Sequence, residues 1–192
     1  MRKTIIFFIT VVVIACHAAA QNLPRVKMQT SLGEIIVEID TINAPVTAKN
    51  FLNHVENNTY KNALFYRVVR MDNQPNNDVK IDVIQGGIYT EPRFETIKPI
   101  AHETTETTGL KHLDGTLSMA RMEPGTASTE FFICVDNQPE LDFGGKRNPD
   151  GQGFAAFGQV VSGMDVVRKI QQQKDEQQTL VEKVKIKEMR VQ

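Results

Sequence analysis

The chain of 192 residues has no tryptophan, only two cysteines and only four histidines, and these low counts exclude several kinds of site. Two cysteines cannot build a disulfide framework or a four-cysteine zinc site. The sequence has no phosphate-binding glycine loop, no Gly-x-Ser-x-Gly motif and no His-Glu-x-x-His motif. Its histidines do not have the spacing of metal ligands. Nucleophilic and metal-based catalysis both lack parts, so we expect no metal and no cofactor.

Charge of one sign is also lacking, because 22 basic residues face 23 acidic ones and the net charge is −1. A balanced chain has no general basic field, which argues against nucleic acid as the main partner. With 41% hydrophobic and 23% charged residues, the composition is that of an ordinary globular protein. The length suits one domain with a real core.

The first twenty residues have the pattern of a secretory signal. Arg2 and Lys3 precede a largely apolar run over residues 5–15, and small residues follow it. This run is shorter than the roughly 20 residues that span a bilayer. We therefore predict a signal peptide over residues 1–20, a domain over residues 21–192, and export from the cytoplasm.

Two processing sites compete at the end of this signal. Residues 18–20 have the small-x-small form that a signal peptidase accepts, which would leave Gln21 as the first residue. Residues 13–16 resemble a bacterial lipobox, in which Cys16 would carry the lipid. A soluble periplasmic form and a form anchored to the membrane only through Cys16 both stay open.

Short apolar segments separated by Gly, Pro, Asn and Asp dominate the rest of the chain. Alternation over residues 26–40 predicts a hairpin that turns at Gly33, and helices are expected to begin near Pro45 and Gly163. Residues 171–178 are expected to form a solvated turn. Further strands are expected over residues 63–69, 79–84, 115–120, 131–135, 154–161 and 181–191. The pattern predicts a β-sandwich or barrel with helices packed over its ends.

Five segments, in their order along the chain, resemble the cyclophilin family of peptidyl-prolyl cis–trans isomerases. They are FYRVV at 65–69, IQGG at 84–87, LSMAR at 117–121, ASTEFFI at 127–133 and DGQGFAAFG at 150–158. The resemblance covers the chain from about Val26 to its end. It implies a mainly β fold, a closed eight-stranded antiparallel barrel capped by two α-helices, with a groove for an extended peptide that contains proline.

The resemblance also implies roles for individual residues. Arg67 matches the catalytic arginine, and Gln85 matches the glutamine that helps to position it. The substrate-binding positions that it implies are Phe132, Leu141, Phe154, Glu130, Ala120 and Arg121. Rotation about an X-Pro bond breaks no covalent bond, so the reaction needs neither a nucleophile nor a metal.

Three departures from the family pattern affect the groove. The connection between the arginine and glutamine segments is longer by about ten residues, from Met71 to Asp78. Asp82 stands where an apolar wall residue would be, and a buried carboxylate there would be costly, so we expect either a rearranged loop or a wetter pocket. Glu130 replaces a typical glutamine, and a carboxylate there can pair with Arg67, which would hold the arginine but also compete for its donors.

Two functional hypotheses follow from these residues. The first is a monomeric, exported isomerase that acts on proline-containing polypeptides during the folding of extracytoplasmic proteins. The second is a catalytically weak cyclophilin-like binding module or chaperone for proline-containing segments, which Asp82 and Glu130 favour. An accessory subunit of an envelope assembly is a third possibility, for which the sequence has no specific sign.

Overall fold

The computed structural model describes residues 22–192, so the predicted signal peptide and the candidate lipid site at Cys16 lie outside the described residues. The described chain begins with the expected hairpin of β1 (Arg25–Thr30) and β2 (Glu34–Ile39). Every second residue of both strands is buried, as an alternating sequence with one wet face requires. The Oγ1 of Thr30 donates to the carbonyl of Gly33 (2.7 Å) and closes the turn.

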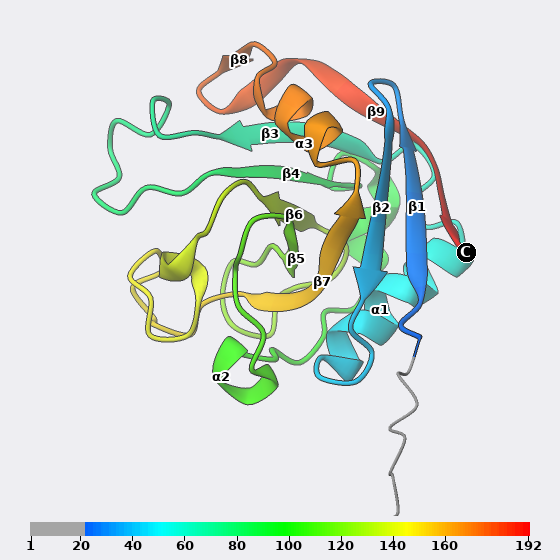
Figure 1. The fold of residues 1–192 in the computed structure, drawn as a ribbon, viewed down its shortest axis with the longest axis horizontal. Coiled ribbons are helices and arrows are strands. Elements are labelled where there is room, and N and C mark those ends of the chain that lie inside the picture. The colour runs from blue at the N-terminus through cyan, green and yellow to red at the C-terminus, as the bar shows by residue number, and fades with distance from the viewer. Residues whose placement is uncertain (1–21) are drawn as a thin grey trace, which may run out of the picture.

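Eight antiparallel strands close into a barrel, which confirms the predicted fold class (Figure 1). Around the barrel their order is β1, β2, β7, β5, β6, β4, β3 and β9, and β9 pairs back onto β1. Beyond the hairpin, the strands are β3 (Leu64–Val69), β4 (Val83–Gly87), β5 (Thr116–Met119), β6 (Phe131–Cys134), β7 (Ala155–Ser162) and β9 (Thr179–Val191). A two-residue strand, β8 (Asp175–Glu176), extends β9 as a small hairpin.

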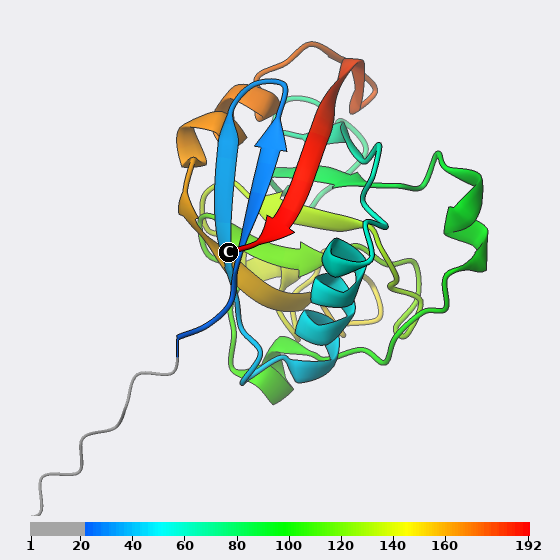
Figure 2. The same cartoon turned by 90° about the vertical axis from the view of Figure 1, so that its right-hand side faces the viewer.

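The two predicted helices are present and cover opposite ends of the barrel (Figure 2). Helix α1 (Pro45–Glu56) begins at Pro45, where the missing N–H costs no hydrogen bond. Its Phe51 packs against Phe131 and Phe157 in the barrel interior, with ring centroids 5.6 and 5.1 Å apart. Helix α3 (Met164–Gln171) contacts β2, β3 and β4. A single-turn helix, α2 (Thr105–Thr108), was not predicted.

One strand prediction was misplaced. Residues 79–82, expected to belong to a strand, form an ordered loop, and β4 begins only at Val83. The Asp82 carbonyl still accepts from the backbone N–H of Val135 (2.9 Å), but the backbone of Val79 and Ile81 bonds to side chains. The Gln74 side chain bonds to both the N–H and the carbonyl of Ile81, and Arg147 donates to the carbonyl of Val79.

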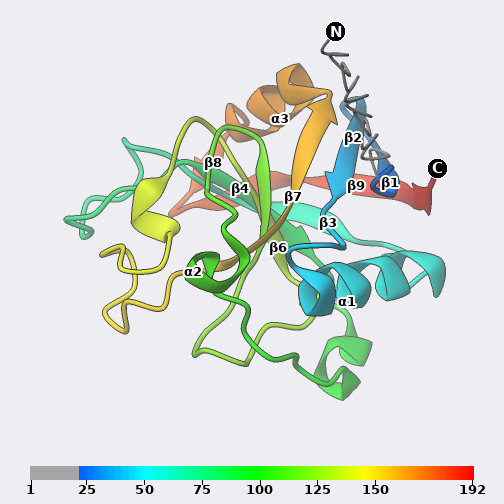
Figure 3. The same cartoon turned by 60° about the horizontal axis from the view of Figure 1, so that its bottom comes forward.

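Two long loops project from the same side of the barrel, away from α1 (Figures 1 and 3). One joins β3 to β4, and the other runs from the 3₁₀ turn Pro139–Leu141 to β7. The Arg147–Val79 hydrogen bond (2.6 Å) ties the two loops together. No helix within residues 22–192 is long and apolar enough to cross a bilayer.

Candidate active site

A β-bulge in β3 turns two consecutive side chains toward the outside of the barrel. In the pairing of β3 with β4, Phe65 lies opposite Gly86 and Arg67 lies opposite Gln85, which makes Tyr66 the extra residue. Phe65 is fully buried in the barrel core. Tyr66 and Arg67 both hydrogen-bond to the side chain of Gln85. The bulge therefore places a hydroxyl and a guanidinium on one outer face.

Two neutral amide side chains hold the guanidinium of Arg67. Its Nη1 donates to Gln85 Oε1 (2.8 Å), and its Nε and Nη2 donate to Gln178 Oε1 (3.1 and 2.6 Å). These bonds use three of the five N–H groups of arginine, which leaves one hydrogen on Nη1 and one on Nη2. Burial lowers the pKa of Arg67, but a guanidinium stays charged in proteins. Arg67 is thus a fixed, charged donor with two free N–H groups.

A directional chain of hydrogen bonds supports Gln85 from behind. The hydroxyl of Tyr66 donates to Glu130 Oε2 (2.6 Å) and accepts from Gln85 Nε2 (2.8 Å). Because the single hydroxyl hydrogen points to the carboxylate, the hydroxyl oxygen can only accept from Gln85. The amide of Gln85 must therefore turn its oxygen toward Arg67. The Glu130 carboxylate therefore sets the donor and acceptor direction of every hydrogen bond in this series.

The predicted pairing of Glu130 with Arg67 was wrong. The carboxylate of Glu130 is buried and accepts instead from Tyr66, from the Ile88 N–H (2.7 Å) and from Thr129 Oγ1 (3.2 Å). Burial raises the pKa of Glu130, while these hydrogen bonds oppose the increase. The extra residue of the bulge explains the difference, because Tyr66 lies between the carboxylate and the guanidinium.

An apolar pocket lies next to Arg67 on the outer face of the barrel. Phe132 and Phe154 meet edge to face with their centroids 5.3 Å apart, and Leu141 is fully buried beside them. Ile81 and Val83 complete the apolar walls of a hollow of about 270 Å³, which Arg67 and Gln85 also line. The structure therefore brings the predicted proline-pocket residues together with the predicted catalytic pair.

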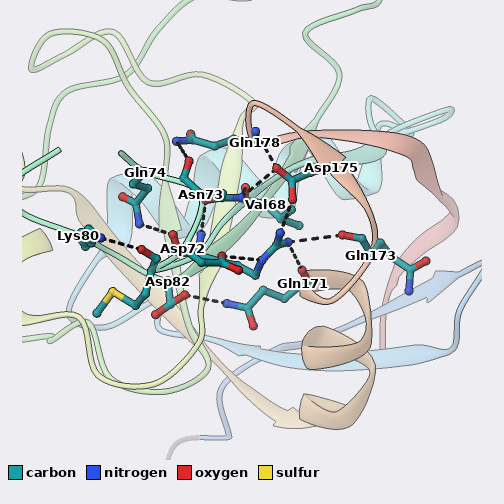
Figure 4. A network of polar contacts seen from close by, with 12 residues as sticks. Val68, Asp72, Asn73, Gln74, Lys80, Asp82, Gln171, Gln173, Asp175 and Gln178 are labelled. Carbon is teal, nitrogen blue, oxygen red and sulfur yellow. Dashed lines mark hydrogen bonds and ion pairs between the residues drawn. The ribbon is translucent and has the colours of Figure 1, made fainter. Parts of the chain in front are cut away.

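Asp82 does not line this pocket, so of the two expectations the rearranged loop is the one that the structure shows. Its Oδ1 accepts from the Gln171 side chain of α3 (3.2 Å; Figure 4), whereas Ile81 and Val83 line the pocket. Burial raises its pKa. Since the two neighbours of Asp82 line the pocket, this wall is apolar.

The fold, the guanidinium and the pocket agree with what known proteins show. Residues 25–191 match the family model described as cyclophilin type peptidyl-prolyl cis-trans isomerase/CLD. A peptidyl-prolyl cis-trans isomerase of Acinetobacter baylyi is 38% identical over 173 residues, which are 88% of this chain and 82% of that one. Peptidyl-prolyl cis-trans isomerase B of Escherichia coli K12 is 38% identical over 149 residues, 76% of this chain and 82% of the relative. This chain belongs to the cyclophilin family.

A solved structure supports the fold independently. The crystal structure of a cyclophilin type peptidyl-prolyl cis-trans isomerase from Cryptosporidium parvum superimposes with a TM-score of 0.71, covering 88% of this cyclophilin and 98% of that chain. The two sequences are only 22% identical, so this likeness concerns the fold alone. The predictions of a cyclophilin-type isomerase and of its barrel are confirmed.

Ala120 and Arg121, predicted to contact the peptide, line the same hollow of this cyclophilin. The N–H of Ala120 donates to the Glu130 carbonyl (2.8 Å), so it is not free for a peptide. Among residues 22–192, the Ala120 carbonyl and the Arg121 N–H have no partner. The Arg121 guanidinium forms a two-pronged ion pair with Asp150 (2.8 and 3.0 Å) and lies 5.2 Å from the centroid of the Phe154 ring.

Three residues of the site were not predicted. Tyr66 lies inside the family-like segment 65–69, but no local sequence pattern indicates the β-bulge that turns its side chain toward Gln85. Gln178 lay in a stretch interpreted as a solvated turn. It has a positive backbone φ of 73°, and its side chain accepts hydrogen bonds from Arg67. Arg147 reaches the pocket from the loop after Leu141, whose course depends on contacts with another loop.

Proposed function

We propose that this cyclophilin accelerates X-Pro isomerisation in extracytoplasmic proteins, with Arg67 as its catalytic residue. The observation that carries the proposal is the position of the Arg67 guanidinium, fixed by two amides at the edge of an apolar pocket. The proline-containing polypeptide would lie along the outer face, with its proline ring in that pocket.

The barrier to be lowered comes from amide resonance. It is roughly 18–20 kcal/mol, and the uncatalysed exchange takes tens to hundreds of seconds. When the X-Pro bond twists, the nitrogen lone pair leaves conjugation and becomes a hydrogen-bond acceptor. A donor that meets this lone pair binds the transition state more tightly than the planar ground state, and this difference accelerates the reaction.

The two free N–H groups of Arg67 can make this contact. Its neighbours Gln85 and Gln178 are uncharged, so they orient the guanidinium without neutralising it. A carboxylate in the same place would bind these donors more strongly and compete with the substrate. The wall formed by Phe132 and Phe154 suits a proline ring, which carries no polar group to satisfy.

The two residues that favoured a weak binding module, Asp82 and Glu130, do not support it in the structure. Asp82 bonds to α3, and Glu130 bonds to Tyr66 and to backbone and threonine donors. Neither carboxylate contacts Arg67. Isomerase activity therefore has the better support.

Nuclear magnetic resonance exchange spectroscopy on an Ala-Pro peptide tests the catalytic assignment. Removal of one preorganised donor costs about 100-fold or more in rate, so Arg67→Ala should lose about that much of kcat/KM. Arg67→Lys keeps the charge but loses the two-sided hold, and it should also be slow. Equal exchange rates for the wild type and Arg67→Ala would refute the assignment.

The extracytoplasmic part of the proposal rests on the sequence of residues 1–20. Mass spectrometry of the protein purified from its own cell envelope tests this part. A free Gln21 supports a soluble exported form, and a lipid on Cys16 supports an anchored one. An intact Met1 in the mature protein would contradict export by either route.

A further inference from the structure

The turn between β8 and β9 has an unusual sequence for its backbone. Glu176 pairs with Thr179, so Gln177 and Gln178 form a two-residue hairpin turn with φ values of 50° and 73°. Two central residues with positive φ define a turn that strongly prefers Asn and Gly. A side chain with a Cβ is strained in this region, and strained residues concentrate at functional sites.

Both the side chain and the backbone of Gln178 form hydrogen bonds from this position. Its Oε1 accepts from the Nε and Nη2 of Arg67, and its Nε2 donates to the Asn73 carbonyl (3.2 Å). Its backbone N–H donates to Asp175 Oδ2 (2.9 Å), and its carbonyl accepts from the Val68 N–H (2.9 Å). A glycine would fit the turn better but would leave two N–H groups of Arg67 without an acceptor.

A polar network that includes Asp175 and Asn73 holds the turn in place (Figure 4). The Asp175 carboxylate accepts from Arg70 and from Asn73 Nδ2 (3.1 Å) in addition to the Gln178 N–H. Asn73 Nδ2 also donates to the Val68 carbonyl (3.1 Å) and so ties the β3–β4 loop to β3. The adjacent Gln177 is exposed and makes no side-chain hydrogen bond within residues 22–192.

We propose that Gln178 is a positioning residue that sets the direction in which Arg67 presents its free N–H groups. Gln178 fixes one side of the guanidinium and Gln85 fixes the other. This inference rests on the proposed function, because it assumes that Arg67 acts on the prolyl nitrogen. The strain of the turn is retained because glycine cannot supply the amide oxygen.

Gln178→Gly and its neighbour Gln177→Gly form a matched pair of variants. Both remove one strained Cβ, which favours the folded state, but Gln178→Gly also loses three side-chain hydrogen bonds, so only Gln177→Gly should melt at or above the wild-type temperature. Only Gln178→Gly should lower kcat/KM, by about tenfold and mainly through kcat, because small misplacements of a catalytic group are costly. The ¹H–¹⁵N signal of the Arg67 Nε should shift in Gln178→Gly and stay in place in Gln177→Gly.

The outcomes separate this inference from the proposed function. If Arg67→Ala is inactive while Gln178→Gly keeps full activity, the positioning role is wrong and the catalytic assignment stands. If both glycine variants lose the same activity, the turn acts only through its structure and the inference is also wrong. If the wild type is inactive on every proline peptide, the proposed function fails first.

A separate observation concerns the charge around the pocket. Three guanidinium groups line it, those of Arg67, Arg121 and Arg147, and no Asp or Glu is among the lining residues. Arg121 is neutralised by Asp150. Arg67 and Arg147 bind only uncharged oxygens. In a chain with a net charge of −1, this groove has two positive charges without a carboxylate partner.

Arg147 is held by one nitrogen only. Its Nη1 donates to Gln74 Oε1 (2.9 Å) and to the Val79 carbonyl (2.6 Å), while its Nε and Nη2 have no acceptor among residues 22–192. Burial and the nearby charge of Arg67 both lower the pKa of Arg147. An anionic group in the groove would relieve this repulsion and accept from the free nitrogens.

From this arrangement we infer that the free side of Arg147 binds an acidic side chain within two positions of the substrate proline. The inference deepens the proposed function, since it names a class of substrate for the same groove. Because the acceptors of Arg67 and Arg147 are uncharged, they do not neutralise the two guanidinium groups, whose positive charge can still attract an acidic substrate. Arg121, already paired with Asp150, is not expected to contribute.

Peptide pairs that differ only by Glu and Gln, placed before or after the proline, test this preference. The wild type should favour Glu in one of these positions by about fivefold in kcat/KM at low salt, and less at high salt. The preference is the ratio of the two rates within one protein, so Arg147→Gln should bring the Glu/Gln ratio to about one, whereas Arg147→Lys should keep part of the preference. A wild type without preference, or a preference that survives Arg147→Gln, overturns the inference.

Discussion

Replacing Glu130 by glutamine tests the directional chain of hydrogen bonds that leads through Tyr66 and Gln85 to Arg67. Three donors point at the carboxylate: the Tyr66 hydroxyl at 2.6 Å, the Ile88 N–H at 2.7 Å and the Thr129 hydroxyl at 3.2 Å. An ionised carboxylate only accepts, so it satisfies all of them. An amide in Glu130→Gln turns one of its two ends into a donor. That end must face either Tyr66 or Ile88.

Both orientations of this amide are costly. If its NH₂ faces Ile88, two buried donors oppose each other, which costs about 1–3 kcal/mol. If its NH₂ faces Tyr66, the hydroxyl hydrogen turns toward Gln85, and Gln85 then loses the orientation in which its oxygen accepts from Arg67. The neutral amide also avoids the desolvation cost of a buried carboxylate, so the effect on stability partly cancels. The effect on activity has no such compensation.

We therefore expect Glu130→Gln to lower kcat/KM about tenfold, which corresponds to about 1.4 kcal/mol of transition-state stabilisation. Exchange spectroscopy on an Ala-Pro peptide at pH 7.5 measures it. Tyr66→Phe breaks the same chain one link nearer to Arg67 and serves as the control. Because both residues act through one chain, the double variant should be little slower than either single variant. An unchanged or faster Glu130→Gln would refute the chain, since a faster enzyme is expected if Glu130 competes for Arg67.

The same chain predicts how wild-type activity depends on pH. Burial raises the pKa of Glu130 above its usual value. When the pH falls through this raised pKa, the carboxyl group gains a proton and becomes a donor, so the orientation of Tyr66 and Gln85 is lost. Wild-type kcat should therefore fall on the acid side, and Glu130→Gln should not show this decrease. An identical acid limb in both proteins would assign the titration to another group.

Three further predictions concern stability and reactivity. In Gly87→Ala the new Cβ would lie 2.2 Å from Glu130 Oε1 at a φ of +151°, so denaturant unfolding should show a loss of about 2–3 kcal/mol, and a loss below 0.5 kcal/mol would contradict the tight contact. Burial lowers the pKa of His112 below the 6.5 of the unfolded chain, so the unfolded state binds the proton more tightly. Stability should then decrease as the pH falls from about 6.5 through the lower folded pKa, and urea unfolding that is flat between pH 5 and 7 would refute this. Cys134 is fully buried and burial raises its pKa, so a thiol reagent such as DTNB should label it only in denaturant; rapid labelling of the native protein would refute its burial.

The barrel and its ligand-facing residues could be predicted because their signals are local. Alternation fixed which side of each strand faces the core, and motif segments in the right order indicated the family. Arg67 and Gln85 stand directly opposite each other in the β3–β4 ladder despite the long loop between them. Register across a hairpin is set by the paired strands, so a longer loop leaves it unchanged as long as the strand ends still meet.

The wrong partner for Glu130 has a structural origin that the sequence does not show. The resemblance placed Glu130 among the substrate-binding positions, and Glu130 lines a second hollow that shares Gln85 and Ala120 with the pocket. The resemblance could not show that a bulge inserts Tyr66 between Glu130 and the guanidinium. A bulge depends on the pairing of two strands that are distant in sequence, and β3 itself has no glycine to mark it.

The longer β3–β4 connection is a departure from the family pattern that was expected to affect the groove. In the structure this connection supports the groove. Gln74 is fully buried, and its Nε2 donates to the carbonyls of Arg70 and Ile81 (both 2.7 Å), so the two ends of the loop are clamped together. Closing a longer loop costs only a logarithmic increase in entropy, and two such hydrogen bonds offset it. The clamped loop then supplies Gln74 Oε1 to Arg147 and the Asn73 carbonyl to Gln178. The inserted residues therefore support both flanks of the groove, which explains how the chain keeps Arg67 opposite Gln85 despite the longer connection.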